Sequence, residues 1–217
     1  MKPTPVDLML QRHAPVEVVP VYGEFEALSG IGHRFLLARD GLWLESRRAW
    51  AYVRWPIAQS RKVSIPAGEL QKEAKLSFGK LPRWLVEDFS SLARDASPAE
   101  VGAVVVWDEE TGEFELLGTK TLQSGIGYLR YERPEVPPKR HIVMDLHSHG
   151  PLKAYFSKTD VADTGSEVVI CVVVGTVDEA VSVRVSLFAC GLQIPVAWDE
   201  STNGDGVAML QGAWQAI

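Results

Sequence analysis

One stretch of this 217-residue chain restricts the fold more than any other: residues 167–175, EVVICVVVG, form an almost unbroken β-branched apolar run. A strand with one face in water alternates apolar and polar residues, whereas a strand buried on both faces is apolar throughout. The run therefore predicts the central strand of a sheet that is covered on both sides.

The segments around this run predict a mixed α/β domain over residues 76–200. Leu81, Leu85, Phe89 and Leu92 recur at helical spacing, with Pro82 at an early position that a helix tolerates. Apolar segments predict further strands at 102–107, 113–118, 121–131, 141–149, 180–189 and 192–198. A short helix is expected from about residue 157. The segment ERPEVPPKR at 132–140 holds three prolines and excludes a helix.

Residues 1–75 predict a small β-rich N-terminal domain. The segment VEVVPVYGEF at 16–25 looks extended, and residues 33–57 alternate around an Asp40-Gly41 turn, which favours a hairpin. Trp43, Trp50 and Trp55 form either an exposed binding face or a small core, and the core is favoured because clustered tryptophans bury large areas. Residues 201–217 are expected to be a polar C-terminal tail with a short helix at most.

The amino-acid composition limits the classes of partner that this chain is expected to bind. The formal net charge of −6 comes from interleaved acidic and basic residues, so we expect no nucleic-acid partner, which would need clustered Lys and Arg. The chain has no apolar run of the ~18 residues that span a bilayer and no signal-peptide pattern, so no membrane association and a cytoplasmic location are expected. Cys171 and Cys190 lie in apolar runs and are expected to be buried thiols, with a disulfide as the alternative.

The pattern with chemical content is His147-Ser148-His149, followed after seven residues by Ser157 and then Asp160. Alternate side chains of a strand share a face, so the two imidazoles point the same way. A loop and the first turn of a helix can bring Asp160 to them. Two imidazoles and a carboxylate leave the fourth position of a tetrahedral Zn²⁺ for water, which is typical of a catalytic site.

Hydrolysis at such a site needs a base and an oxyanion donor. Glu100 lies between the predicted helix and the strand at 102–107, where it can reach the metal, and the Ser157 hydroxyl can donate to the oxyanion. Ser157 and Asp160 also fit a helix capping box, and both roles can hold together. Asp145 shares the strand face of the histidines and is a weaker candidate, as an acceptor that orients a ligand imidazole.

Other titratable residues have ordinary explanations. Asp163 is expected to be exposed, one turn beyond Asp160. Carboxylates near the turn after residue 107 indicate a solvated face: Glu109, Glu110, Glu113 and Glu115. The remaining histidines lack partners at ligand spacing and are expected to be structural or surface residues: His13, His33 and His141.

Together, Glu100 before an apolar strand and His147-x-His149-x(7)-Ser157-x(2)-Asp160 resemble the JAMM or MPN+ metalloprotease signature. By chance the four spaced residues would occur in only a few of about 10⁴ chains of this length. The resemblance covers roughly residues 80–198. It implies a JAMM/MPN-like fold, zinc bound by His147, His149 and Asp160, water activation by Glu100 and stabilisation of the tetrahedral intermediate by Ser157. It also implies cleavage of peptide or isopeptide bonds, often after ubiquitin or a ubiquitin-like protein.

The layout, with RFLLARDGLWLE at 34–45 and VVVWDEETG at 104–112, is also similar to protein A of the bacterial PRTRC system. That gene cassette includes a ThiF-like and a ubiquitin-like component. The chain departs from the JAMM pattern in three places. Gly150 precedes Pro151 after the second histidine, and Gly102 lies two residues after Glu100 rather than three. The proline-rich 132–140 stands where the family often has a second helix, so the resemblance does not fix the substrate groove or the substrate.

The expected function is therefore zinc-dependent hydrolysis of an amide bond in a protein substrate, with a ubiquitin-like tail as the implied partner. The alternative is a catalytically silent MPN-type scaffold, which the complete ligand set disfavours. A zinc hydrolase of small amides also stays open. An amidohydrolase barrel is excluded because it needs ~200 residues after its first strand and only about 70 follow His149.

Overall fold

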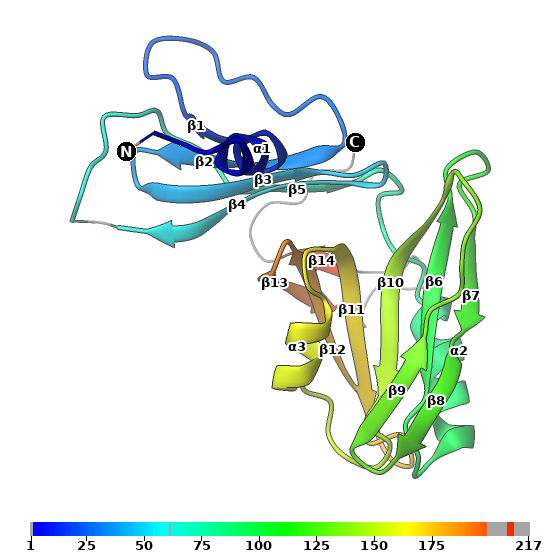
Figure 1. Ribbon diagram of the computed structural model, residues 1–217. Helices are drawn as coiled ribbons and strands as arrows, with labels where there is room; N and C mark the ends of the chain where they lie inside the picture. The colour runs from blue at the N-terminus through cyan, green and yellow to red at the C-terminus, as the bar shows by residue number, and fades with distance from the viewer. Residues whose placement is uncertain (1, 61, 199–207, 211–217) are drawn as a thin grey trace. The chain divides into compact units, whose positions relative to one another are not determined.

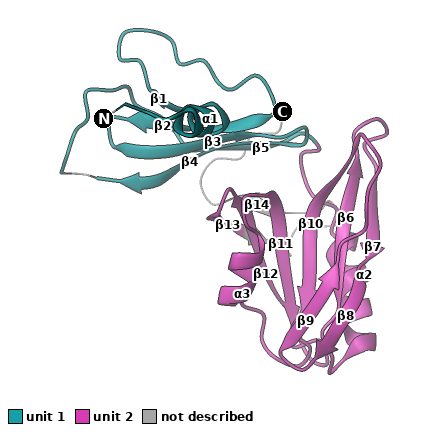
Figure 2. Cartoon of the chain, in the orientation of Figure 1, with its two compact units in different colours: residues 1–77, 212–217 teal, residues 78–211 magenta. Residues whose placement is uncertain are grey.

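The structure is a computed structural model that describes residues 2–60, 62–198 and 208–210. The chain forms two compact units, one up to Ser77 and one from Phe78 (Figure 2). Each is described by itself. Among the described helices, none combines the length and apolar character needed to cross a lipid bilayer.

Unit 1 is a five-stranded sheet whose order follows the chain, β1-β2-β3-β4-β5 (Figure 1). The strands are β1 (Val16–Val18), β2 (Gly32–Ala38), β3 (Gly41–Arg47), β4 (Ala51–Gln59) and β5 (Glu73–Leu76). The predicted hairpin is confirmed, since β2 pairs antiparallel with β3 and Ala38 faces Gly41. Trp43, Trp50 and Trp55 are buried, so they fill the core. Of the extended segment at 16–25, only Val16–Val18 forms a strand, and it pairs in parallel with β2.

Helix α1 (Pro5–His13) was not predicted from the sequence. Thr4 and Asp7 form a capping box at its start, and Pro5 stands at its first position. No residue of α1 is buried. The helix therefore begins at a strong local signal rather than at an apolar stripe.

The core of unit 1 also holds an ionic cluster around Glu45, whose side chain is fully buried. Its carboxylate accepts hydrogen bonds from Arg34 Nε, from the Tyr52 hydroxyl and, at 2.9 Å, from the main-chain N–H of Leu28. Burial and this hydrogen bond raise the pKa of Tyr52. The cluster thus ties the loop before β2 to the face of the sheet.

Unit 2 contains a seven-stranded mixed sheet in the order β14-β13-β12-β11-β10-β6-β7. Its strands are β6 (Gly102–Asp108), β7 (Phe114–Gly118), β10 (Arg140–Ser148), β11 (Val168–Gly175), β12 (Ser182–Ala189), β13 (Leu192–Trp198) and β14 (Ala208–Leu210). Strand β11 is central and every residue of it is buried, as the apolar run predicts. It pairs in parallel with β10, whereas the other neighbours pair antiparallel.

In the part of unit 2 that the structure describes, two helices accompany this sheet, α2 (Trp84–Ala96) and α3 (Lys158–Asp163). Helix α2 buries Leu85 and Phe89, as the helical spacing predicts, but Leu92 is 45% exposed, which corrects that part of the expected stripe. Val86 and Ala93 complete the buried face instead. Residues 133–137 form no helix, in agreement with the prolines. Strand β14 lies within the expected C-terminal tail, where the sequence suggested a short helix at most, and this corrects that expectation because Ala208–Leu210 pair with β13. The rest of the tail, 201–207 and 211–217, lies outside the described residues.

The strand predicted over 121–131 is instead a hairpin, which corrects the sequence-based expectation. Strands β8 (Lys120–Gly125) and β9 (Tyr128–Glu132) form a separate two-stranded sheet. The chain reverses at Ile126 and Gly127, where Gly127 adopts a φ of 79° that favours glycine. The hairpin lies close to β6, because a Cβ on Gly102 would come within 2.9 Å of Thr119 Oγ1 and 3.3 Å of Leu129.

Candidate metal centre

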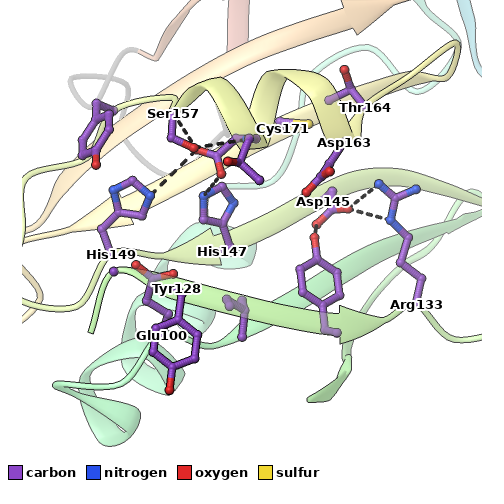
Figure 3. Close-up of a pocket in the computed structure, with 16 residues that line it drawn as sticks. Glu100, Tyr128, Arg133, Asp145, His147, His149, Ser157, Asp163, Thr164 and Cys171 are labelled. Carbon is purple, nitrogen blue, oxygen red and sulfur yellow. Dashed lines mark hydrogen bonds and ion pairs between the residues drawn. The ribbon is translucent and has the colours of Figure 1, made fainter. Parts of the chain in front are cut away.

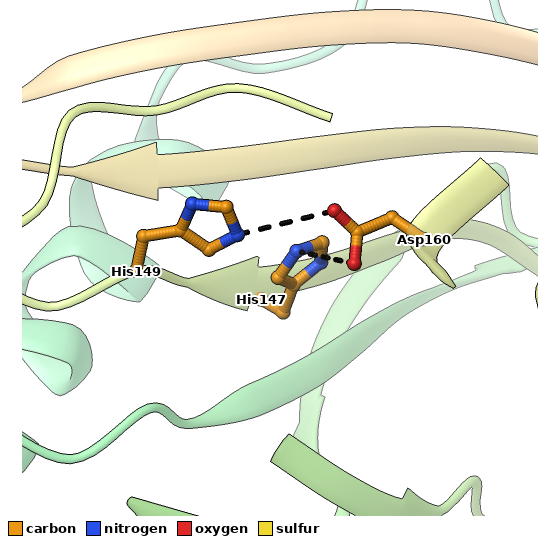
Figure 4. Close-up of side chains that lie close together, drawn as sticks. All are labelled: His147, His149 and Asp160. Carbon is orange, nitrogen blue, oxygen red and sulfur yellow. Dashed lines mark ion pairs between the residues drawn. The ribbon is translucent and has the colours of Figure 1, made fainter. Parts of the chain in front are cut away.

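His147 and His149 stand at the end of β10, with their side chains on the same side of the sheet (Figure 4). Strand register sets this position: His147 faces Val173 of the central strand and Gly102 of β6. The ring centroids are 5.2 Å apart. The alternation expected for a His-x-His pair on a strand therefore brings the two imidazoles together.

Asp160 reaches the imidazoles because the loop after His149 folds back on the sheet. Gly150 adopts a φ of 53°, and a Cβ there would approach the Pro98 carbonyl oxygen to 2.8 Å. The Asp160 carboxylate lies with Oδ1 3.4 Å from His147 Nε2 and Oδ2 3.9 Å from His149 Nε2. The three candidate ligand atoms all lie within 4.8 Å of one another.

The chemistry of this trio fits a zinc ion. His147 Nε2 is buried and has no hydrogen-bond partner among the described residues, although it points at the shared space. Burial, and then the charge of His147, lower the pKa of His149, which favours the neutral form of its ring. Burial alone would raise the pKa of Asp160, but His147 and the Ser157 N–H outweigh it and lower that pKa to about 2. Neutral imidazoles and an ionised carboxylate are the forms that bind metal.

Glu100 lies in the same pocket as the trio, below the two imidazoles in the view of Figure 3. Its side chain is 7% exposed. Burial raises the pKa of its carboxyl above the usual value; the charge of His147 lowers it, Asp160 raises it, and the Gly127 N–H lowers it. A buried carboxylate whose pKa is raised is suited to accept and return a proton near neutral pH.

Ser157 lines this pocket as well. It is the N-cap of α3, and its hydroxyl oxygen accepts the Asp160 N–H at 3.1 Å. That hydroxyl also lies beside the Asp160 carboxyl and helps to lower its pKa, so Ser157 and Asp160 face the same space. The pocket has a volume of about 200 Å³, enough for a small part of a substrate rather than a whole ligand.

Asp145 lines the pocket but does not orient a histidine, which overturns that expectation. Its carboxylate accepts the Tyr131 hydroxyl at 2.6 Å and the Arg133 guanidinium at 2.6 Å. Arg133 also pairs with Glu167. Asp145 therefore binds strand β9 and the residue after it to β10.

The remaining predicted residues lie as expected or away from the site. Asp163 is exposed and lines the outer pocket. His141 pairs with Glu109 at 2.7 Å, while Glu110 and Glu115 pair with Lys139 and Arg140 near the β6–β7 turn. Glu113 and His13 are exposed and His33 is half-buried. Both cysteines are free, Cys171 buried and Cys190 half-buried.

Tyr155 is a site residue that sequence reasoning missed. Its ring packs edge-on against His149, with centroids 4.6 Å apart. It comes from the loop between β10 and α3, where no periodic pattern indicates the direction of a side chain. The one signal that the sequence offers is that Tyr155 is the aromatic residue nearest to His149 in that loop.

Comparison with known proteins finds a family model that matches each part of the chain. Residues 82–187 match the prokaryotic homologs of the JAB domain, and residues 4–77 match a domain of unknown function, DUF2016. A comparison with curated proteins finds no match. The first match covers every residue of the candidate metal centre. Residues 82–187 of unit 2 therefore form a JAB-like domain, and the β-rich residues 4–77 are similar to DUF2016.

Proposed function

We propose that unit 2 is a zinc-dependent peptidase or isopeptidase that hydrolyses an amide bond in a protein substrate. The observation that carries the proposal is the convergence of His147, His149 and Asp160 in one pocket with Glu100 and Ser157. We further propose, from the resemblance to the PRTRC protein, that the substrate bond lies at the C-terminus of a ubiquitin-like protein.

Each residue of the candidate site has its own role in the proposed hydrolysis. His147, His149 and Asp160 would hold Zn²⁺, which supplies Lewis acidity and lowers the pKa of water toward ~7. Glu100 accepts a proton from the attacking water and passes it to the leaving amine, so one buried carboxylate serves both halves of the reaction. The Ser157 hydroxyl donates to the oxygen of the tetrahedral intermediate, where charge develops.

Metal content tests the first part of the proposal. The purified wild-type chain should hold about one zinc per chain, and His149→Ala should lose it because two ligands cannot retain the ion. Glu100→Gln should keep the zinc. Glu109→Gln is the matched control, since Glu109 pairs with His141 outside the pocket. A wild type free of metal after zinc loading contradicts the site.

Hydrolysis tests the second part. The zinc-loaded chain is incubated with a fluorescence-quenched peptide library and with a ubiquitin-like protein that carries a short C-terminal extension, and products are identified by mass spectrometry. Wild type and Glu109→Gln should cleave, whereas Glu100→Gln should lose at least about 100-fold in rate. A zinc-loaded wild type that cleaves neither substrate supports the MPN-type scaffold instead.

A further inference from the structure

The peptide group between Glu100 and Val101 is bound by two serine hydroxyls from opposite sides. Its carbonyl oxygen accepts a hydrogen bond from Ser124 Oγ, and its N–H donates to Ser148 Oγ at 3.0 Å. Ser148 comes from β10, between the two histidines, and Ser124 comes from β8. One peptide plane next to the candidate base is therefore held between the main sheet and the hairpin.

Ser124 and Ser148 together form a clamp on this peptide group, and the β10 side of the clamp lies in the core. Ser148 is fully buried, and its main-chain N–H donates to the Val101 carbonyl oxygen at 3.0 Å. This reciprocal pair extends the β6–β10 ladder to the residue just before the start of β6. Because the ladder also fixes His147 opposite Gly102, Ser148 keeps Val101 in register with the metal ligands.

The hairpin side of the clamp is less buried than the β10 side. The N–H of Glu100 donates to the Gly125 carbonyl at 3.2 Å, beside the Ser124 contact. Ile126 and Tyr128 at the hairpin tip are largely exposed. The base of the hairpin is bound separately, since the Tyr131 hydroxyl donates to the buried carboxylate of Asp145. The tip thus contacts the main chain of Glu100 through Ser124 and Gly125, and the Glu100 carboxyl through the Gly127 N–H.

We propose that Ser124 is a positioning residue that sets the direction of the Glu100 carboxylate through the Glu100–Val101 peptide plane. The inference rests on the proposed function, because it takes Glu100 as the base. With the Ser124 bond, the peptide planes on both sides of the Glu100 Cα are fixed, so the Cα–Cβ bond from which the side chain starts has one direction. Without it, the Glu100 carbonyl loses a partner and the peptide plane can turn about its remaining contacts with Ser148.

The test compares hydroxyl removal at Ser124 with removal elsewhere on the same strand. Ser124→Ala removes the donor, Ser124→Cys nearly preserves the volume with a weak donor, and Ser124→Thr restores the hydroxyl. Thr121→Val is the matched control, because Thr121 is exposed on β8 and its side chain has no hydrogen bond among the described residues. Thermal unfolding and zinc content are measured for each variant.

In the zinc-loaded chain, kinetics use the library peptide that the wild type cleaves fastest. Ser124→Ala and Ser124→Cys should lower kcat about 10- to 100-fold with KM within about twofold, as expected for a misplaced catalytic group. Ser124→Thr and Thr121→Val should match the wild type, and zinc content should be unchanged in all. A folded Ser124→Cys with the wild-type kcat overturns the inference.

A second readout is independent of hydrolysis. Amide hydrogen exchange of Glu100 and Val101, followed by NMR, should be at least about tenfold faster in Ser124→Ala and Ser124→Cys than in Thr121→Val, because exchange reports local opening. If the wild type cleaves no peptide, the proposed function fails, but faster exchange still supports the clamp. Unchanged exchange at both amides refutes it.

Discussion

Ser157 and Asp160 bind each other in both directions: the Ser157 N–H donates to Asp160 Oδ2 at 2.6 Å, and the Asp160 N–H donates to the Ser157 hydroxyl at 3.1 Å. This pair begins helix α3 and also fixes the carboxylate that faces the two histidines. The capping and metal-site interpretations of Ser157-x-x-Asp160 are therefore compatible, because one oxygen completes the cap while the other lies 3.4 Å from His147 Nε2.

Removal of the Ser157 hydroxyl should affect both stability and rate. Ser157→Ala is expected to lower the free energy of unfolding by about 1 kcal/mol through loss of the cap, and to lower kcat about 10²-fold through loss of an oxyanion donor. Urea denaturation and steady-state kinetics measure the two effects. Thr4→Ala is the control, because Thr4 caps α1 in the same way within unit 1. A Ser157→Ala variant with full kcat would exclude the oxyanion role.

Zinc should stabilise unit 2 against heat, because the ligands converge only in the folded state. We expect added zinc to raise the midpoint of thermal unfolding of the wild type, and Asp160→Asn to lose most of this rise. Asp163→Asn should keep it, since Asp163 is exposed one helical turn from Asp160 and lines the pocket without joining the trio. Differential scanning calorimetry with and without chelator measures the shift. Equal shifts in the two variants would count against Asp160 as a ligand.

The sequence predicted the parts of the fold that depend on local periodicity. The apolar run at 167–175 gives the central strand, and the helical spacing of Leu85 and Phe89 gives the stripe that α2 buries. The β8–β9 turn was missed because a single extended strand was predicted over residues 121–131, although Gly125 and Gly127 are turn signals. Helix α1 was missed because its apolar residues form no stripe, although its capping box is visible in the sequence.

The dependence on local periodicity also explains which contacts of the candidate site could be predicted from the sequence. Strand alternation places Asp145 on the pocket face, which is where it lies. Its partners, Tyr131 and Arg133, come from a hairpin that the sequence did not reveal, so its role as an anchor could not be predicted. The Ser124 contact with Glu100 depends on the same hairpin. Spacing along one strand predicts shared faces, whereas contacts between separate sheets require the tertiary structure.

Cys171 should be the less reactive of the two thiols. Its side chain is 8% exposed, and burial, with the nearby charge of Asp145, raises the pKa of the thiol, so little thiolate forms. In the folded chain, one equivalent of a disulfide reagent should react at pH 8, at the half-buried Cys190. The second should react only after urea unfolds the chain. Cys190→Ser should abolish the fast phase, and a fast phase that persists in this variant would show that the pocket admits the reagent to Cys171.

Of the residues that form ion pairs in unit 1, Glu45 should contribute most to the stability of that unit. Its buried carboxylate serves Arg34, Tyr52 and the Leu28 N–H, so Glu45→Ala leaves a largely buried guanidinium without its main partner. Breaking one side of a buried pair typically costs about 3–5 kcal/mol. We expect a loss of that order in the free energy of unfolding of unit 1.

The matched control is Glu69→Ala. Glu69 pairs with Arg39 at 2.7 Å, but both side chains are exposed, and such surface pairs contribute about 0–1 kcal/mol. Urea denaturation followed by tryptophan fluorescence compares the variants, since Trp43, Trp50 and Trp55 are buried in unit 1. Zinc content should stay unchanged in both, because all three candidate ligands belong to unit 2. If Glu45→Ala is no less stable than Glu69→Ala, the ionic cluster does not hold the loop before β2 in place, and apolar packing around the tryptophans accounts for that stability.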